Sequence, residues 1–250
     1  LEDVGSKTQK DVMKYFLKFG EKVCNWLDQA GYALCKGDVM AKNPRWCQPL
    51  GTWKKYFSEW IHKAEPEALL QASIFFDFRG AYGEIALIDE LRRHLFGALR
   101  GWPGFFRHLS ENALYFTPPI GFFRRFVQED DGSHSEGLNL KHRGIVPIID
   151  LVRMRALEAG VREANTFRRM ELAVAAGTMN EGDAKSLKDA LRLISRIRLA
   201  HQADQMTQGR EPTNFVPPDE LSPLMRRTLK AAFMLVVEAQ SGLAIRYQVH

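Results

Sequence analysis

Apolar side chains recur every three or four residues along most of the chain, which is the spacing of amphipathic helices. Residues 8–29 show the pattern first, and it stops before Gly31, a residue type that favours helix C-termini. The same spacing predicts further helices at residues 53–61, 66–79, 83–99, 104–116, 144–159, 163–176, 181–207 and 219–240. The sequence therefore predicts a mainly α protein built as a helical bundle.

The predicted helices fall into a short first part and a long second part. A turn signal at Asn43-Pro44 places a domain boundary near residues 43–50, so we expect one domain at residues 1–45 and a larger one at residues 46–250. Residues 128–138 are the one clearly polar stretch, and we expect them to form a loop inside the larger domain.

Composition narrows the class of protein. The 250 residues are 45% hydrophobic, enough for one large core or for a small and a larger one. Cys24, Cys35 and Cys47 lack metal-ligand spacing and favour a reducing compartment, so we expect a cytoplasmic protein without a metal. No apolar run approaches the roughly 18 residues that span a membrane, and the arginine pairs are scattered over predicted helix faces. We therefore expect neither a membrane nor a nucleic acid as partner.

The most aromatic run of the chain, residues 73–84, contains a charged pair. Asp77 and Arg79 stand among three phenylalanines, and charges buried among aromatic rings need a partner. One interpretation is a structural ion pair that locks two helices together. The other is a ligand-recognition strip, in which Arg79 binds a phosphate or carboxylate and Asp77 orients it or holds a metal or an amine.

The predicted helix at residues 181–207 turns polar partway along its inward face. The stripe on this face consists of Leu187, Leu191, Ile194, Arg198, His201 and Gln205, with Gln202 beside the last two. Either the C-terminal half of the helix emerges into water, or these polar side chains line a cavity at the mouth of the bundle, where Arg198 needs an anion. His201 does not by itself indicate a metal, because no second His or Cys stands at ligand spacing.

Another predicted helix, at residues 144–159, carries Arg153 one turn from the apolar Ile149. Asp150 precedes Arg153 by three residues, so the two side chains either pair along the helix or face a ligand together. Lys141 lies just before this helix, after a short stretch that favours extended structure.

Several of these blocks resemble a known family. The run SIFFDFRGAYGE, residues 73–84, is similar to the bacterial signal-transduction family that joins cyclic-nucleotide-binding and CBS domains to a nucleotidyltransferase and its C-terminal substrate-binding domain. The resemblance continues, in order, at residues 31–61, 138–170, 198–205 and 213–233. It covers nearly the whole chain.

The resemblance implies that residues 1–45 are the C-terminal remnant of an α/β nucleotidyltransferase domain and that residues 46–250 are the helical substrate-binding domain. A similar bundle in antibiotic nucleotidyltransferases faces the catalytic cleft and helps to bind the acceptor. The residues that the resemblance gathers around one anion-binding cleft are Asp77, Arg79, Lys141, Asp150, Arg153 and Arg198. The implied ligands are a nucleotide or an anionic small molecule, together with a regulatory protein as acceptor, as in uridylylation of the nitrogen-regulatory PII protein.

One expected motif is missing from the chain. Nucleotidyltransferases of this superfamily carry a Gly-Ser turn followed by an Asp-x-Asp pair, whose carboxylates hold the metals that bridge the nucleotide phosphates. This chain has no Asp-x-Asp, and Gly5-Ser6 is not followed by one. We therefore expect no catalytic residue and no cofactor here, while Mg²⁺ and a nucleoside triphosphate are implied for the intact protein.

Two functions stay open at this point. The chain is either the substrate-binding portion of a nucleotidyltransferase, inactive alone, or a non-catalytic regulatory module. Such a module would bind a nucleotide or a partner in cyclic-nucleotide and CBS signalling. A homodimer is compatible with both.

Overall fold

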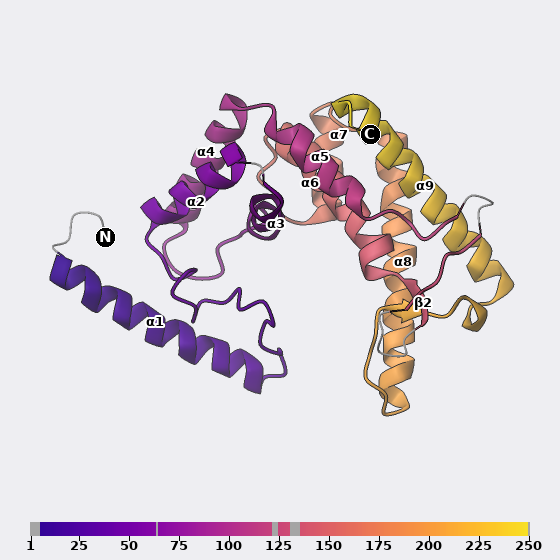
Figure 1. Cartoon of the computed structure of the whole chain (residues 1–250), viewed down its shortest axis with the longest axis horizontal. Helices are drawn as coiled ribbons and strands as arrows, with labels where there is room; N and C mark the ends of the chain where they lie inside the picture. The colour runs from indigo at the N-terminus through magenta and orange to yellow at the C-terminus, as the bar shows by residue number, and fades with distance from the viewer. Residues whose placement is uncertain (1–5, 64, 122–124, 131–135, 250) are drawn as a thin grey trace. The chain divides into compact units, whose positions relative to one another are not determined.

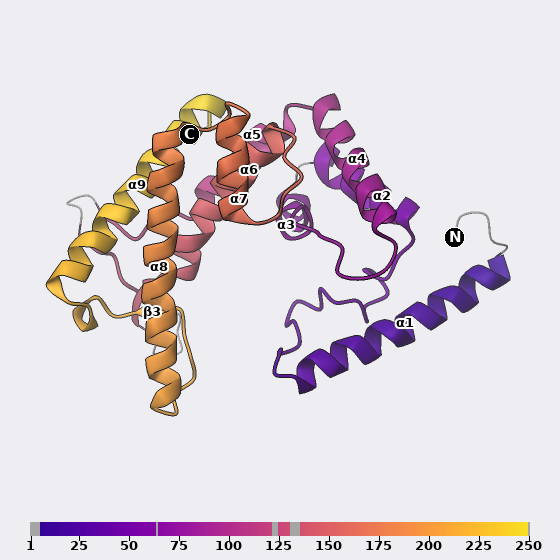
Figure 2. The same cartoon turned by 180° about the vertical axis from the view of Figure 1, so that it is seen from behind.

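The computed structural model describes residues 6–63, 65–121, 125–130 and 136–249. Over this part of the chain 68% of the residues are in helices and 3% in strands, which confirms the mainly α prediction. The helices are α1 (Ser6–Gln29), α2 (Leu50–Lys63), α3 (Pro66–Phe75), α4 (Ile85–Gly101), α5 (Phe105–Tyr115), α6 (Val146–Glu158), α7 (Thr166–Ala175), α8 (Glu181–Thr207) and α9 (Pro223–Tyr247) (Figures 1 and 2). The shorter elements are β1 (Glu129–Asp130), β2 (Glu136–Asn139), the π-helix η1 (Lys141–Ile145), β3 (Phe215–Val216) and the 3₁₀-helix η2 (Pro218–Glu220).

The chain forms two compact units. The first comprises the residues up to Glu59 together with Tyr82–Leu95, and it contains α1, most of α2 and the beginning of α4. The second comprises Trp60–Ala81 and the residues from Phe96 onward, which form the helical bundle. The boundary that the sequence predicts near residues 43–50 stays a prediction.

Local sequence signals explain where the bundle helices begin. Asn165 accepts a hydrogen bond from the Arg168 amide at the start of α7, and Asn180 accepts one from the Gly182 amide at the start of α8. These are N-caps, which satisfy amides that have no partner inside the helix. Helix α8 covers the predicted residues 181–207.

Helix α3 ends at Phe75, four residues before its predicted end. The Phe76 amide still bonds to the Ala72 carbonyl, and the chain then leaves the helix. Asp77 therefore lies in the segment between α3 and α4, where it can reach residues of other helices.

The core of the bundle lies between α6, α7, α8, α9 and the short strands. Leu138 of β2 pairs with Val216 of β3 in an antiparallel ladder, and both side chains are buried against α8 and α9. Gly144 of η1 lies so close to this core that an added Cβ would come within 2.9 Å of Ile194 and 3.3 Å of Phe233. Helix α8 and helix α9 therefore pack against the π-helix through a position without a side chain.

Of the predicted polar loop at residues 128–138, residues 131–135 lie outside the described part of the chain. The described ends of this stretch belong to β1 and β2, which pair in antiparallel register with Glu129 opposite Gly137. The strands β1, β2 and β3 follow one another in this order in one small sheet.

Helix α9 is relevant to the expectation that no apolar segment is long enough to span a membrane. Over the described residues, it is a helix long and apolar enough to span a membrane by length and composition. The expectation that no run approaches this length therefore does not hold for α9. A core helix of a soluble protein meets the same criterion, and Leu229, Phe233 and Val236 of α9 are buried in the bundle core.

Candidate functional site

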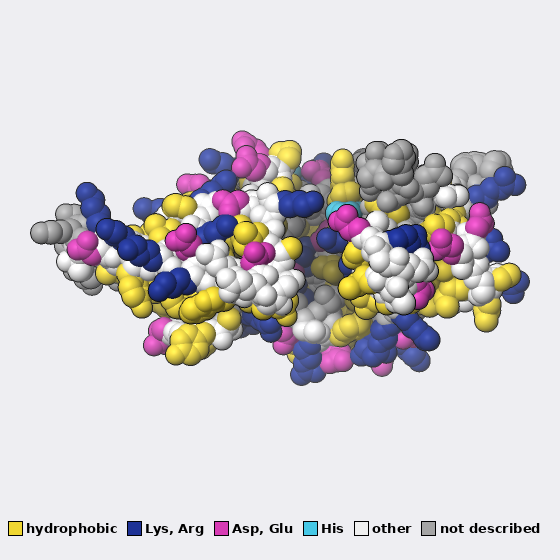
Figure 3. Space-filling view, turned by 90° about the horizontal axis from the view of Figure 1, so that it is seen from below, with side chains coloured by type: hydrophobic (Ala, Val, Ile, Leu, Met, Phe, Trp, Pro, Cys, Tyr) yellow, Lys and Arg dark blue, Asp and Glu magenta, His cyan; other side chains and the backbone are white. Residues whose placement is uncertain are grey.

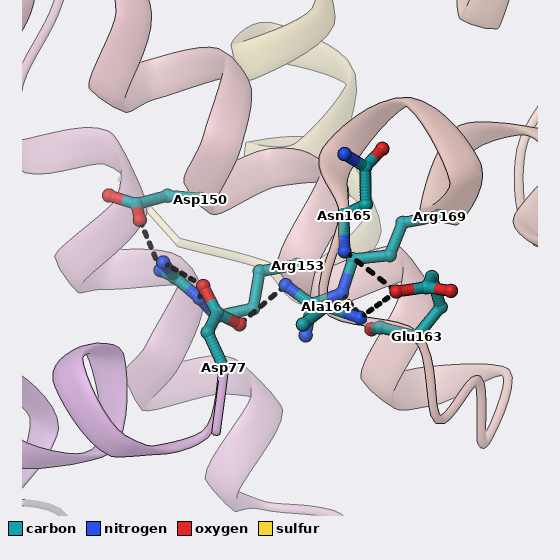
Figure 4. A network of polar contacts seen from close by, with 7 residues as sticks. All are labelled: Asp77, Asp150, Arg153, Glu163, Ala164, Asn165 and Arg169. Carbon is teal, nitrogen blue, oxygen red and sulfur yellow. Dashed lines mark hydrogen bonds and ion pairs between the residues drawn. The ribbon is translucent and has the colours of Figure 1, made fainter. Parts of the chain in front are cut away.

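Asp77 lies at the centre of a buried network of charged side chains (Figure 4). Arg153 donates to Asp77 Oδ2 from Nε at 3.0 Å and from Nη2 at 2.7 Å. Its Nη1 donates to Asp150, and Nη1 of Arg169 donates to the other oxygen of Asp77. We call Asp77, Asp150, Arg153 and Arg169 the charged quartet.

The quartet joins three separate parts of the second unit. Asp77 comes from the segment after α3, Asp150 and Arg153 come from α6, and Arg169 comes from α7. Arg169 is also held by the loop before α7, because its Nε donates to the Glu163 carbonyl at 2.6 Å. The network therefore links the chain around Asp77 to α6 and α7 within the second unit.

The buried guanidinium groups of this network are paired with carboxylates of the same network. Arg153 is 7% exposed and Arg169 is 3% exposed, and the two guanidinium groups face two carboxylates. Every nitrogen of the Arg153 guanidinium donates to a carboxylate of the quartet. This arrangement favours the structural interpretation of Asp77, with Arg153 and Arg169 as its partners instead of Arg79.

The two carboxylates differ in how easily they ionise. Burial alone would raise the pKa of Asp77, but the hydrogen bonds and charges of Arg153 and Arg169 outweigh burial and hold that pKa below its ordinary value. Burial raises the pKa of Asp150, and its single arginine partner does not offset the effect. Asp77 is therefore the carboxylate on which the network depends.

The same contacts decide whether the site suits a metal. Asp77 and Asp150 both accept hydrogen bonds from Arg153, so a Mg²⁺ ion would have to displace a guanidinium group from each. Over the described residues, no group of three or more His, Cys, Asp or Glu side chains is placed to hold a metal ion. The quartet does not fit the Mg²⁺ that the resemblance implies for an intact enzyme.

Sequence reasoning missed Arg169. The sequence places its arginine pairs on predicted helix faces, and a solvated position fits the Arg168 side chain at 58% exposure. Arg169, the other member of that pair, is only 3% exposed. One signal was available, because Arg169 stands one turn before the buried Ala173 and next to the buried Met170. Its partner Asp77 lies 92 residues away, and no local pattern indicates that pairing.

A second group of polar side chains lies on α8. Arg198 donates from Nε to Asn214 Oδ1 at 2.7 Å, and Gln202 donates to the same oxygen at 3.4 Å. Gln205 accepts from the Thr213 amide at 2.8 Å and donates to the Thr213 hydroxyl at 3.2 Å. The segment before β3 therefore covers the polar stripe of α8.

His201 is a second largely covered residue of this stripe, beside Gln205. Its side chain is 9% exposed, and Nδ1 lies 3.3 Å from a carboxylate oxygen of Glu220. Nε2 is buried and has no hydrogen-bond partner among the described residues. His201 and Gln205 are both largely covered, whereas Leu199 and Met206 in the same half of α8 are exposed. A ligand cavity along the stripe stays a prediction.

The structure thus divides the predicted site residues. It joins Asp77, Asp150 and Arg153 in the quartet, and it places Arg198, His201, Gln202 and Gln205 along α8 under residues 213–220. Arg79 and Lys141 are exposed and take part in neither group. Arg153 and Arg198 thus contact different residues, and a single cleft shared by these two arginines and Arg79 stays a prediction.

The fold and these two groups define a mainly helical protein. Its bundle contains the charged quartet and the polar stripe of α8, in which the His201 Nε2 has no partner within the described ranges. Residues 103–247 match the family model described as "Putative nucleotidyltransferase substrate binding domain". This match covers more than half of the chain, so the chain belongs to that family. Residues 1–67 match the model described as "Putative nucleotidyltransferase DUF294". Comparison with curated proteins and with solved structures finds no significant match.

Proposed function

We propose that this chain is the substrate-binding portion of a nucleotidyltransferase and that the polar stripe of α8 contacts the acceptor. The observation that carries the proposal is the buried Nε2 of His201, which has no partner among the described residues. A buried polar atom without a partner is uncommon, and a bound ligand is one group that satisfies it. The family match supports the same class of function.

Arg198 gives the stripe its preference for an anion. It lies one turn before His201 on α8, and only its Nε is engaged, by Asn214. The two Nη nitrogens donate to no described residue, so they are available to a carboxylate or phosphate in the fork geometry that arginine favours. Lys141 follows Leu140, whose amide bonds to the Asn214 carbonyl at 3.0 Å, and adds a second positive charge next to the same segment.

The proposed acceptor is either an anionic small molecule or a regulatory protein, and the resemblance to PII uridylylation favours the protein. The chain itself contains no Asp-x-Asp pair, so it lacks the carboxylates that hold metal ions during phosphoryl transfer. Mg²⁺ and the nucleoside triphosphate would be bound by the catalytic part of the enzyme. The bundle's own task would be to hold the acceptor.

Two measurements test this function. Incubation of the 250-residue chain with labelled nucleoside triphosphates, Mg²⁺ or Mn²⁺ and candidate acceptor proteins should give background incorporation, and reproducible metal-dependent labelling would refute the assignment. Titration with inorganic phosphate and with succinate, followed by the NMR signals of the histidine rings, should shift the His201 signal. The Arg198→Gln variant should abolish this shift.

Arg196→Gln is the matched control, because Arg196 lies on the same helix and is exposed. If Arg196→Gln reduces the shift as much as Arg198→Gln, or if neither anion moves the His201 signal, the stripe is not an anion site. In that case the non-catalytic regulatory module becomes the better description of the chain.

A further inference from the structure

A cavity of about 340 Å³ lies inside the second unit, between α6, the start of α8 and α9. Arg155 of α6 lines it together with Asp183 of α8 and Glu238 of α9, so charges of both signs border one space. Its apolar lining includes Leu151 and Leu187, which are both buried. The cavity therefore differs from the charged quartet, in which the charges bind one another.

The Arg155 guanidinium group retains most of its capacity to donate hydrogen bonds. Its Nη1 is buried and has no hydrogen-bond partner among the residues that the structure describes. One oxygen of Glu158 lies 3.5 Å from this nitrogen without forming a hydrogen bond, and the other accepts from Arg246. Because a guanidinium group carries five N–H donors, Arg155 can still bind a carboxylate in the fork geometry that arginine favours.

The carboxylates of Asp183 and Glu238 have no cationic partner within the described ranges. Asp183 lies in the first turn of α8, where the helix dipole stabilises a carboxylate without any ligand. Glu238 lacks this explanation, because it lies well inside α9, and the residues three and four positions away on that helix include no lysine or arginine. A positively charged group in the cavity would supply the missing partner.

The walls of the cavity are held in place without a ligand. The Thr178 hydroxyl donates to the Arg155 carbonyl at 3.1 Å, which ties the α7–α8 loop to α6. Asn180 caps the start of α8 in the same loop. A Cβ at Gly242 of α9 would meet no described atom within 4 Å beyond its own backbone neighbours, so α9 leaves space here. A site that is already formed loses less free energy to ordering when it binds.

We infer that this cavity binds a free α-amino acid with an apolar side chain. Its carboxylate would bind the Arg155 guanidinium group, and its ammonium group would lie with Asp183 and Glu238. Its side chain would pack on Leu151 and Leu187. The volume is at the lower end of the range of small-molecule sites, which suits a ligand of this size. A ligand with one charge only would leave either the guanidinium group or the carboxylates without a partner.

This inference goes beyond the proposed acceptor site and does not depend on it. At about 1.5 Å per residue, Asp183 and His201 lie roughly 27 Å apart along α8. In Figure 1, α8 starts at the upper end of the bundle near α7 and ends at its lower edge. Figure 3 views that lower side, where acidic, basic and hydrophobic side chains are interspersed. The two sites are at opposite ends of one helix, and failure of one proposal leaves the other unaffected.

Isothermal titration of the 250-residue chain with L-leucine, L-methionine and L-valine tests the inference. We expect saturable binding at one site for at least one of them. Two analogues of the tightest ligand isolate its charges, which for leucine are 4-methylpentanoate, without the ammonium group, and 3-methylbutylamine, without the carboxylate. Each analogue should bind at least about tenfold more weakly, as expected for the loss of one charged hydrogen bond. Absence of binding by all three amino acids, or an analogue that binds as tightly as its parent, would overturn the inference.

Arg155→Gln and Glu238→Gln should each weaken binding of the amino acid by about tenfold. Arg155→Gln should also remove the advantage of the parent over the analogue without a carboxylate, and Glu238→Gln its advantage over the analogue without an ammonium group. Asp189→Asn is the matched control, since Asp189 is exposed on α8 outside the cavity, and it should leave the affinity within about twofold.

Equal weakening by Asp189→Asn and Glu238→Gln would mean general attraction between charges and would contradict a specific site. Circular dichroism of each variant checks that the helices are retained. If Arg155→Gln unfolds the bundle, Glu238→Gln decides the question, because Glu238 is exposed and its substitution must still remove the preference for the ammonium group.

Discussion

Replacing Asp77 with Asn tests the account of the charged quartet most directly. The amide keeps the size of the side chain but removes one of the two negative charges that face Arg153 and Arg169. Arg169 then loses its carboxylate partner and keeps the Glu163 carbonyl as acceptor. A nearly buried guanidinium group without an opposite charge is unfavourable, because burial removes its hydration.

The magnitude follows from burial. Removing one partner of a buried pair costs about 3–5 kcal/mol, and the 26% exposure of the Asp77 side chain lets water offset part of the loss, so we expect Asp77→Asn to lower the free energy of unfolding by about 2–4 kcal/mol. In a chain of this size the midpoint of thermal unfolding should fall by about 5–15 °C. Circular dichroism during heating and during urea titration at pH 7 measures both quantities.

Two further variants decide whether the reasoning is right. Asp150→Asn should cost less than Asp77→Asn, because the raised pKa of Asp150 shows that its ionised form gains little from the fold. Asp189→Asn removes the surface pair with Arg192, in which both side chains are more than half exposed, and should have no measurable effect. A loss below about 1 kcal/mol for Asp77→Asn, well under the cost of breaking a buried pair, would refute the buried-pair account. So would a larger cost for Asp150→Asn.

Two other predictions concern pH and packing. Because the pKa of Asp77 is lower in the folded state, its contribution to stability is present above its unfolded pKa and is lost as the pH falls through the folded value. The difference between wild type and Asp77→Asn should therefore be constant near neutral pH and shrink below about pH 4, and a difference that grows on acidification would contradict this sign. Gly144→Ala should lower the free energy of unfolding by about 1–3 kcal/mol, because its Cβ would press on Ile194 and Phe233. Urea titration measures that loss, and an unchanged midpoint would show that the core has room.

The comparison of sequence with structure shows what periodicity can predict. The limits of α8 and the place of His201 and Gln205 on its inward stripe followed from apolar spacing. The segment that covers these residues, 213–220, did not follow from that spacing. Periodicity describes which face of a helix is inward but carries no information about the segment that packs on it.

The charged quartet shows that sequence patterns also fail to identify the partners of a buried charge. The run around Asp77 indicated a buried charge, and the pairing of Asp150 with Arg153 followed from their spacing. Arg169 could not be assigned to Asp77, since burial of one charge does not identify its partner among many arginines. Long-range pairings of this kind need either coordinates or related sequences.

The place of α9 in the chain has a consequence for synthesis. This helix packs against α5, α6 and α8, and its Leu229, Phe233 and Val236 belong to one core with residues of α6 and α8. It nevertheless follows all three helices in the sequence. At the pace of a ribosome, the roughly 100 residues between the end of α5 and the start of α9 take on the order of 5–20 s to make. During that interval the apolar faces of α6 and α8 that later contact α9 stay exposed to solvent. Chaperone binding to the nascent chain should therefore end only after α9 has left the exit tunnel.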